Sequence, residues 1–191
     1  MPEVRVLTSA SPDLEQKLLL IQKLARQVFE PEIPEDQYES AHITVSQLQL
    51  DNWRDRLRQP HGAIFYVDDE PSTTPEGTKP VAFFLAHPRP LTNSSSVSDI
   101  SSDCYYIYLA AVHPAARSQG LFPLLLEATK QYARQAGYDV LSIGTIPSRF
   151  PRMYRNLTKE GNRWEVVEWK DGLDEHGRQI VGGKVVMKMA L

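Results

Sequence analysis

The hydrophobic pattern of the chain switches between two periods, and these switches predict the order of its elements. Alternating or short apolar runs are typical of strands, whereas apolar residues three and four apart are typical of amphipathic helices. Strands are predicted in the ranges 4–8, 63–67, 81–86, 104–112, 140–144, 163–169 and 184–189. Helices are predicted in the ranges 11–28, 50–57, 121–135 and 152–157. This alternation is typical of a mixed α/β (α+β) domain.

The stretch 104–112 predicts the central strand of the sheet. It contains three tyrosines and is apolar on both faces, as expected for a strand that is covered on both sides. The stretch 121–135 predicts the clearest helix, because Pro123 lies in its first turn and Gly137 follows as a natural end. By contrast, residues 87–103 are rich in Pro and Ser and predict a surface excursion.

Composition narrows the class of protein. The 191 residues fit a single domain, residues 1–191, and the apolar (41%) and charged (24%) fractions are ordinary for a globular protein. A net charge of -3 argues against nonspecific nucleic-acid binding, which needs a basic surface. The single cysteine, Cys104, excludes an internal disulfide, and no segment reaches the ~20 apolar residues that span a bilayer. The first residues lack the apolar core of a signal peptide, so we expect a cytoplasmic protein, with the nucleus as the alternative.

The segment 109–122 carries the clearest chemical signal. A buried strand ends at His113 and Pro114, a loop with Arg117 and Gly120 follows, and a helix then begins. The first amides of a helix have no intrahelical acceptor and carry a partial positive charge. Glycine lets a ligand approach the backbone closely, and Arg117 adds a cation with two parallel donors. Together these features predict an anion-binding site that suits a pyrophosphate.

This segment resembles the acetyl-CoA signature of the GCN5-related N-acetyltransferase (GNAT) superfamily, a strand followed by V-x-P-x-x-R-x-x-G-x-G/A and a helix. The residues that match it in register are Val112, Pro114, Arg117, Gln119 and Gly120. The resemblance implies the GNAT fold, a central, mostly antiparallel mixed sheet with splayed middle strands, flanked by helices. It also implies that acetyl-CoA is the cosubstrate. The implied cofactor-binding residues are Ala110, Val112, Arg117, Ser118, Gln119, Gly120, Leu121 and Phe122.

Two positions depart from the family pattern. Phe122 stands where relatives usually carry Gly or Ala, so its ring either narrows the approach to the phosphates or points into the core. Pro147 and Ser148 stand where the family often has an Asn before the next helix, so one expected cofactor contact has no counterpart here.

The resemblance also implies direct transfer of the acetyl group. The pantetheine arm pairs with the backbone near Ala110 and Val112, in a cleft beside the strand that ends near Ile146. The substrate amine attacks the thioester carbonyl, and Tyr154 protonates the leaving thiolate, as a Tyr on the corresponding helix does in relatives. A phenol suits this role because it keeps its proton near neutral pH. Alternatively, Tyr154 is a packed aromatic residue on a short helix.

The central strand has no carboxylate that could deprotonate the amine. Many relatives carry a Glu near the position of Tyr108, which is therefore the second candidate catalytic residue. Tyr106 shares its strand face by the period of two and is the candidate substrate-binding residue. Alternatively, a water chain or a distant carboxylate is the base and these tyrosines are core aromatics. The acidic stretch 30–39 either steers a cationic amine to the site or is a solvated loop.

The expected function is acetyl-CoA-dependent N-acetylation of a primary amine on a small molecule. Two alternatives remain open: a protein acetyltransferase that acts on a lysine or an N-terminal amine, and a GNAT-fold module that binds CoA without turnover. The five histidines show no metal-ligand spacing, so no metal is expected. We expect a monomer or homodimer whose partners are acetyl-CoA and the amine, with no nucleic acid or membrane.

Overall fold

The computed structural model describes residues 2–29, 48–69, 78–90, 103–145, 151–159, 163–170 and 184–191. The elements are, in chain order, β1 (Arg5–Leu7), α1 (Leu14–Phe29), α3 (Leu50–Arg58), β2 (Ala63–Asp68), β3 (Pro80–Pro90), β4 (Asp103–Val112), the 3-10 helix η3 (Pro114–Ala116), α4 (Leu121–Gln135), β5 (Val140–Thr145), α5 (Pro151–Thr158), β6 (Glu165–Lys170) and β7 (Lys184–Ala190). The chain forms two compact units. The first contains residues 1–87 and 108–132, and the second contains residues 88–107 and 133–191.

The predicted elements are all present in the predicted order, and most of their ends agree within two residues. The main exception is β3, which continues through His87 to Pro90 where the composition predicted a surface excursion. His87 is buried and its Nδ1 lies 3.0 Å from Oε1 of Gln59, so tertiary contacts extend the strand beyond its apolar pattern. The rest of that predicted excursion, residues 91–102, lies outside the described residues, as does the acidic stretch 30–39.

The start of α1 also differs from the prediction. The helix begins at Leu14 rather than directly after Ser11. The Ser11 hydroxyl oxygen accepts a hydrogen bond from the Thr8 amide at 3.0 Å, so it stabilises the turn before the helix.

The seven described strands form one mixed sheet in the order β1-β2-β3-β4-β5-β7-β6. β4 and β5 are parallel, with Tyr105 opposite Leu141 and Ile107 opposite Ile143. The pairs β1–β2, β2–β3, β5–β7 and β6–β7 are antiparallel. The prediction of a mostly antiparallel mixed sheet with residues 104–112 at its centre is therefore confirmed. The splay of the middle strands stays a prediction, as does the organisation of residues 1–191 as one domain.

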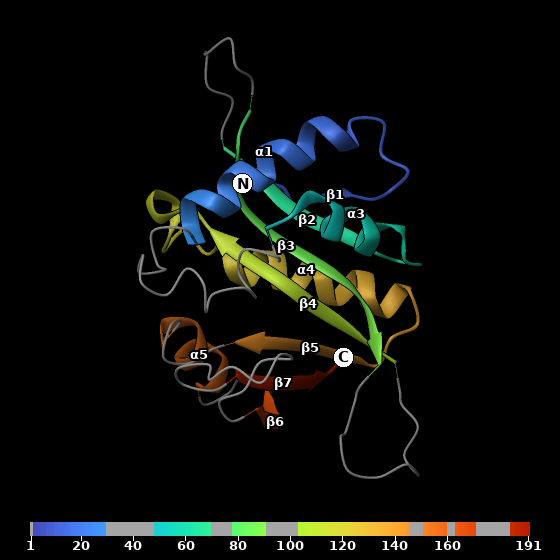
Figure 1. The fold of residues 1–191 in the computed structure, drawn as a ribbon. Coiled ribbons are helices and arrows are strands. Elements are labelled where there is room, and N and C mark those ends of the chain that lie inside the picture. Colours follow the sequence, from blue (N-terminus) through green and yellow to red (C-terminus); the bar gives the residue numbers. More distant parts are fainter. Residues whose placement is uncertain are drawn as a thin grey trace. The chain divides into compact units, whose positions relative to one another are not determined.

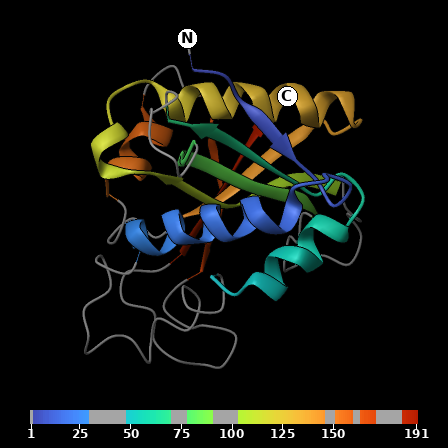
Figure 2. The same ribbon diagram turned by 90° about the horizontal axis from the view of Figure 1, so that it is seen from above.

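In the first unit, helices cover both faces of β2 and β3. α1 and α3 lie on one face and α4 lies on the other (Figure 2). Phe65 of β2 packs against Tyr132 of α4, with ring centroids 5.3 Å apart. On the opposite face, Phe83 of β3 packs against Trp53 of α3 at 5.6 Å. Each buried side chain of this size stabilises the fold by about 1.5–3 kcal/mol, which fixes the strands that carry the site described below.

In the second unit, β7 lies between β5 and β6 (Figure 1). The buried residues of β7 alternate along the strand: Val185, Met187 and Met189. The end of α4 also belongs to this unit, and Gly137 terminates it with φ +85°. The Gly137 amide donates to the Arg134 carbonyl and the Tyr138 amide to the Ala133 carbonyl, both at 3.0 Å. These two bonds form a Schellman motif, which confirms the predicted end of the helix.

Asp68, at the end of β2, connects three segments of the first unit. Its side chain is only 6% exposed and accepts hydrogen bonds from Arg5 and Lys17, each at 3.1 Å, and from the Thr78 hydroxyl at 3.3 Å. Lys17 also lies over the ring of Tyr66, 5.2 Å from its centroid. Burial, and after it the charge of Asp68, raises the pKa of Tyr66. The carboxylate therefore holds the strand edge to the first helix.

Replacement of this carboxylate should destabilise the protein far more than replacement of an exposed one. We expect Asp68→Ala to lower the free energy of unfolding by about 3 kcal/mol, because it leaves the largely buried Lys17 without its partner. Asp55→Ala is the control: Asp55 is 67% exposed and pairs with Arg58 within one helix, so its loss should cost less than about 0.5 kcal/mol. Urea denaturation measures both values, and equal costs would contradict the prediction.

Candidate functional site

The second half of β4 exposes one face of the strand. Leu109 and Ala111 are buried, whereas Tyr108, Ala110 and Val112 are half-buried. Successive side chains of a strand point to opposite faces, so these three residues form one stripe along it. The side chains of Tyr108, Ala110 and Val112 therefore share the less buried face of β4.

A short, well-bonded connection leads from β4 to α4. The His113 amide donates to the Val81 carbonyl at 2.8 Å, which fixes the end of β4 against β3. The His113 carbonyl accepts from the Ala116 amide at 2.9 Å, and its Nδ1 accepts from the Ala115 amide at 3.3 Å. His113 thus shapes the turn from Pro114 to Ala116 and has a structural role.

The next four residues turn the chain into the helix. Ser118 and Gly120 both have left-handed backbones, with φ of 69° and 75°. The Gly120 carbonyl accepts the first helical hydrogen bond, from the Leu124 amide at 3.2 Å. Within the described part of the chain, the amides from Gln119 to Phe122 have no backbone acceptor. This is the arrangement that binds an anion at a helix N-terminus.

Arg117 places a cation beside these amides. Its side chain is exposed, and Nε lies 3.5 Å from the Val112 carbonyl oxygen, a long hydrogen bond that ties the guanidinium to the end of β4. A guanidinium and several amides in the same turn can share the oxygens of a diphosphate. The residues that the sequence assigned to an anion-binding site are therefore brought together in the first unit.

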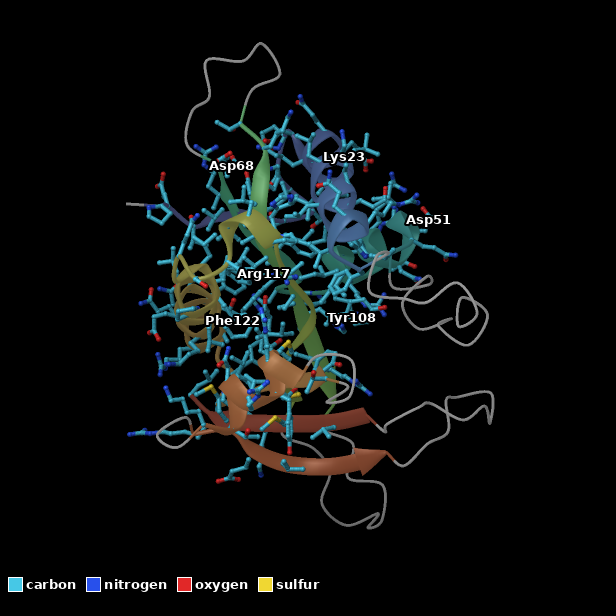
Figure 3. The ribbon with its side chains drawn as sticks, turned by 90° about the vertical axis from the view of Figure 1, so that its left-hand side faces the viewer. Lys23, Asp51, Asp68, Tyr108, Arg117 and Phe122 are labelled. Carbon is cyan, nitrogen blue, oxygen red and sulfur yellow. The ribbon has the colours of Figure 1, made fainter. Side chains whose placement is uncertain are left out.

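Phe122 packs toward β3. Its ring meets the ring of Phe84 edge-on, with centroids 5.0 Å apart. Figure 3 shows Phe122 and Tyr108 on opposite sides of β4, with Arg117 between them in the view. Of the two expectations for the bulky side chain, this contact supports the one in which the ring points into the core.

The predicted site residues are divided between the two units. Tyr108, Ala110, Val112 and the turn 117–122 belong to the first, whereas Tyr106 and Tyr154 belong to the second. Tyr106 is 3% exposed, and the guanidinium of Arg89 lies 4.9 Å from its ring centre. Tyr154 is half-buried on α5. The roles of Tyr106 and Tyr154 stay predictions.

Tyr108 has neighbours that the sequence did not reveal. The guanidinium carbon of Arg56 lies 3.6 Å from the centre of its ring, and the ring of His87 meets it at 5.8 Å. The one signal for Arg56 is its position on α3, three residues after the buried Trp53 and beside the buried Leu57. That spacing places Arg56 at the border of the apolar face of α3. It does not indicate which strand Arg56 contacts.

The described residues contain neither a candidate metal site nor a candidate membrane-spanning helix. Among these residues, no group of three or more His, Cys, Asp or Glu side chains is arranged to hold a metal ion. No described helix combines the length and the apolar character needed to cross a membrane.

The mixed sheet and the turn before α4 agree with the resemblance stated from the sequence. The family model of the acetyltransferase (GNAT) family matches residues 24–155, more than half of the 191 residues. The chain therefore belongs to the GNAT family of acetyltransferases; it is an acyl-CoA-dependent N-acetyltransferase with acetyl-CoA as its cosubstrate. Among curated proteins, none matches the sequence.

Several solved structures with the same fold are named as acetyltransferases. NAA60 of Arabidopsis thaliana in complex with acetyl-CoA is 12% identical, with a TM-score of 0.66 over 100% of this chain and 99% of that chain. The ribosomal-protein-S18-alanine N-acetyltransferase of Escherichia coli is 14% identical, with 0.57 over 100% and 94%. A GNAT family acetyltransferase from Elizabethkingia anophelis with acetyl-CoA bound is 14% identical, with 0.56 over 100% and 98%. At these sequence identities, the similarity between this chain and the solved structures shows only that they share a fold.

Gly120 offers a test of the anion-binding turn. A Cβ built at Gly120 meets no atom within 4 Å, so Gly120→Ala adds only backbone strain of about 1–2 kcal/mol and a methyl group beside the open amides. We expect it to weaken acetyl-CoA binding at least tenfold, a loss of about 1.4 kcal/mol, measured by calorimetry.

Gly137→Ala is a matched control at the other end of the same helix. Its φ is +85° and its built Cβ also meets nothing within 4 Å, so it carries a similar strain without a ligand. We expect both variants to lose similar thermal stability and only Gly120→Ala to lose affinity. If the Gly120→Ala and Gly137→Ala variants bound acetyl-CoA with equal affinity, the turn would not be part of the cofactor site.

Proposed function

We propose that this chain transfers the acetyl group of acetyl-CoA to the primary amine of a small molecule. One observation carries the proposal: a helix start with open amides, a left-handed Gly120 and the cation of Arg117, in a chain of the GNAT family. In this proposal the pyrophosphate accepts hydrogen bonds from the amides of residues 118–122 and from Arg117. The pantetheine arm lies along the backbone at Ala110 and Val112.

The proposed reaction is a direct displacement. The neutral amine attacks the thioester carbonyl carbon, a C–N bond forms and the C–S bond breaks. The CoA thiolate takes a proton from the phenol of Tyr154, which regains one from solvent. The amine loses its proton to water, because β4 has no carboxylate between Cys104 and Val112. Tyr108, at the position where many relatives carry a Glu, is proposed to orient the amine. The roles of both tyrosines rest on the resemblance of their segments to the family.

Removal of one hydroxyl tests the acid. We expect Tyr154→Phe to lower kcat by about 10²–10³-fold, the range for a general acid, and to leave acetyl-CoA affinity within about twofold. Tyr138→Phe is the matched control, since it removes a hydroxyl from the same unit, where the ring of Tyr138 packs on Tyr105 at 5.4 Å. Thiol release measures turnover, and equal rates for the two variants would exclude Tyr154 as the acid.

A protein N-terminal amine is the second candidate acceptor. One structural neighbour is named for that activity, the ribosomal-protein-S18-alanine N-acetyltransferase of Escherichia coli. Thiol release with short peptides, compared with free amines of similar size, separates the two acceptor classes. The third alternative, a module that binds CoA without turnover, is not favoured, because the chain belongs to the GNAT family of acetyltransferases.

A further inference from the structure

The three arginines of α3 have different electrostatic environments. Arg54 donates to Glu15 at 2.6 Å, and Arg58 donates to Asp55 at 2.9 Å. Both pairs lie at the surface, where each charge has its counter-ion. Arg56 has no carboxylate partner among the described residues, although its side chain is half-buried. Arg56 is therefore the arginine of α3 whose charge no described carboxylate offsets.

The contacts of Arg56 hold its guanidinium over β4. The guanidinium carbon lies 3.6 Å from the centre of the Tyr108 ring, and Nη1 donates to the Asn52 carbonyl at 2.7 Å. Nε is buried and has no hydrogen-bond partner among the described residues. Stacking on an aromatic ring favours the cation and leaves the N–H groups in the guanidinium plane available as donors, of which one on Nη1 already binds Asn52. Among the described residues, no acceptor atom meets the remaining N–H groups in the guanidinium plane.

Tyr108 is itself held in place from a second side. The ring of His87 meets it edge-on at 5.8 Å, and Nδ1 of His87 lies 3.0 Å from Oε1 of Gln59. Tyr108 and Ala110 lie on the same side of β4, about 7 Å apart by the rise of a strand. Figure 3 shows Tyr108 on the side of the strand away from Phe122. The cation is thus fixed close to the backbone where the end of the pantetheine arm is proposed to lie.

We propose that Arg56 binds a carboxylate of the acceptor, so that the enzyme acetylates the amine of an amino acid or of a similar small amino acid-like molecule. The proposal rests on the proposed function, because it needs the thioester beside Ala110. A planar guanidinium matches a carboxylate through two parallel hydrogen bonds, and its orientation is already set by the Tyr108 ring. Because Nε is buried, the terminal nitrogens Nη1 and Nη2 are the donors proposed for the carboxylate. A peptide N-terminus carries no carboxylate next to its amine unless the first side chain supplies one.

The same cation also acts on the amine. A positive charge close to an amine disfavours the protonated form and lowers its pKa. The neutral amine is the nucleophile, so Arg56 increases its fraction near neutral pH. This effect offsets part of what the carboxylate base of many relatives provides, which β4 lacks.

The experiment compares amino acids with their carboxamides. Thiol release from acetyl-CoA is measured with the common amino acids, each paired with its carboxamide. For the wild type, we expect at least one amino acid to exceed its carboxamide in kcat/KM by about ten- to hundredfold, the range of a charged hydrogen bond. In Arg56→Met, which keeps an unbranched side chain over the Tyr108 ring, this ratio should fall to about one. Arg56→Lys should restore part of it.

Arg58→Met is the matched control, because it removes an exposed arginine of the same helix that is paired with Asp55. It should keep the full ratio. Melting temperature and acetyl-CoA affinity show whether each variant is folded and binds its cosubstrate. A ratio near one in the wild type, or a ratio unchanged in Arg56→Met, would overturn the proposal.

If no pair turns over, binding replaces turnover as the readout. The N-acetylated amino acids of the panel and their carboxamides are then compared as thermal stabilisers of the CoA-loaded protein. Stabilisation by an acid alone, lost in Arg56→Met, supports the proposal, and no difference between acids and amides overturns it. Failure of the proposed function gives a different result, since acetyl-CoA would then neither bind nor release thiol with any amine.

Discussion

The turn that joins β4 to α4 is the constraint on which the cofactor site depends. Two left-handed residues, Ser118 and Gly120, reverse the chain so that the first amides of α4 have no backbone acceptor among the residues that the structure describes. Such a turn is costly for most residues, and it persists because both of its ends are fixed. His113 is bonded to β3 before it, and Phe122 packs on Phe84 after it. The anion-binding geometry thus follows from packing that can be named residue by residue.

Local patterns were sufficient to predict the elements. α4 was predicted at 121–135 and has those bounds, because its apolar stripe, Pro123 and Gly137 all act within a few residues of one another. The course of β3 beyond Ala86 could not be predicted in this way. His87 is an ordinary loop residue by composition, and its contacts with Gln59 and Tyr108 join it to residues distant in the sequence.

The same distinction holds for the site. The anion-binding turn is contiguous, so a linear signature could locate Arg117 and Gly120 and indicate their role. The contact between Arg56 and Tyr108 joins residues more than fifty positions apart, and no spacing in the sequence encodes it. The periodicity of α3 could show that Arg56 borders the apolar face, but the partner across that face is set by the order of strands in the sheet.

In the proposed site, the main chain and the side chains of β4 have different roles. The cofactor is proposed to pair with main-chain groups at Ala110 and Val112, and main-chain groups are the same whatever the side chains are. The acceptor is proposed to contact two side chains, Tyr108 and the arginine stacked on it. A fold built in this way can keep one cosubstrate while its acceptors change, because substitutions on the face of β4 toward α3 leave the backbone unchanged. For this chain the deciding charge is then a single cation whose neighbours on α3, Arg54 and Arg58, are already neutralised by carboxylates.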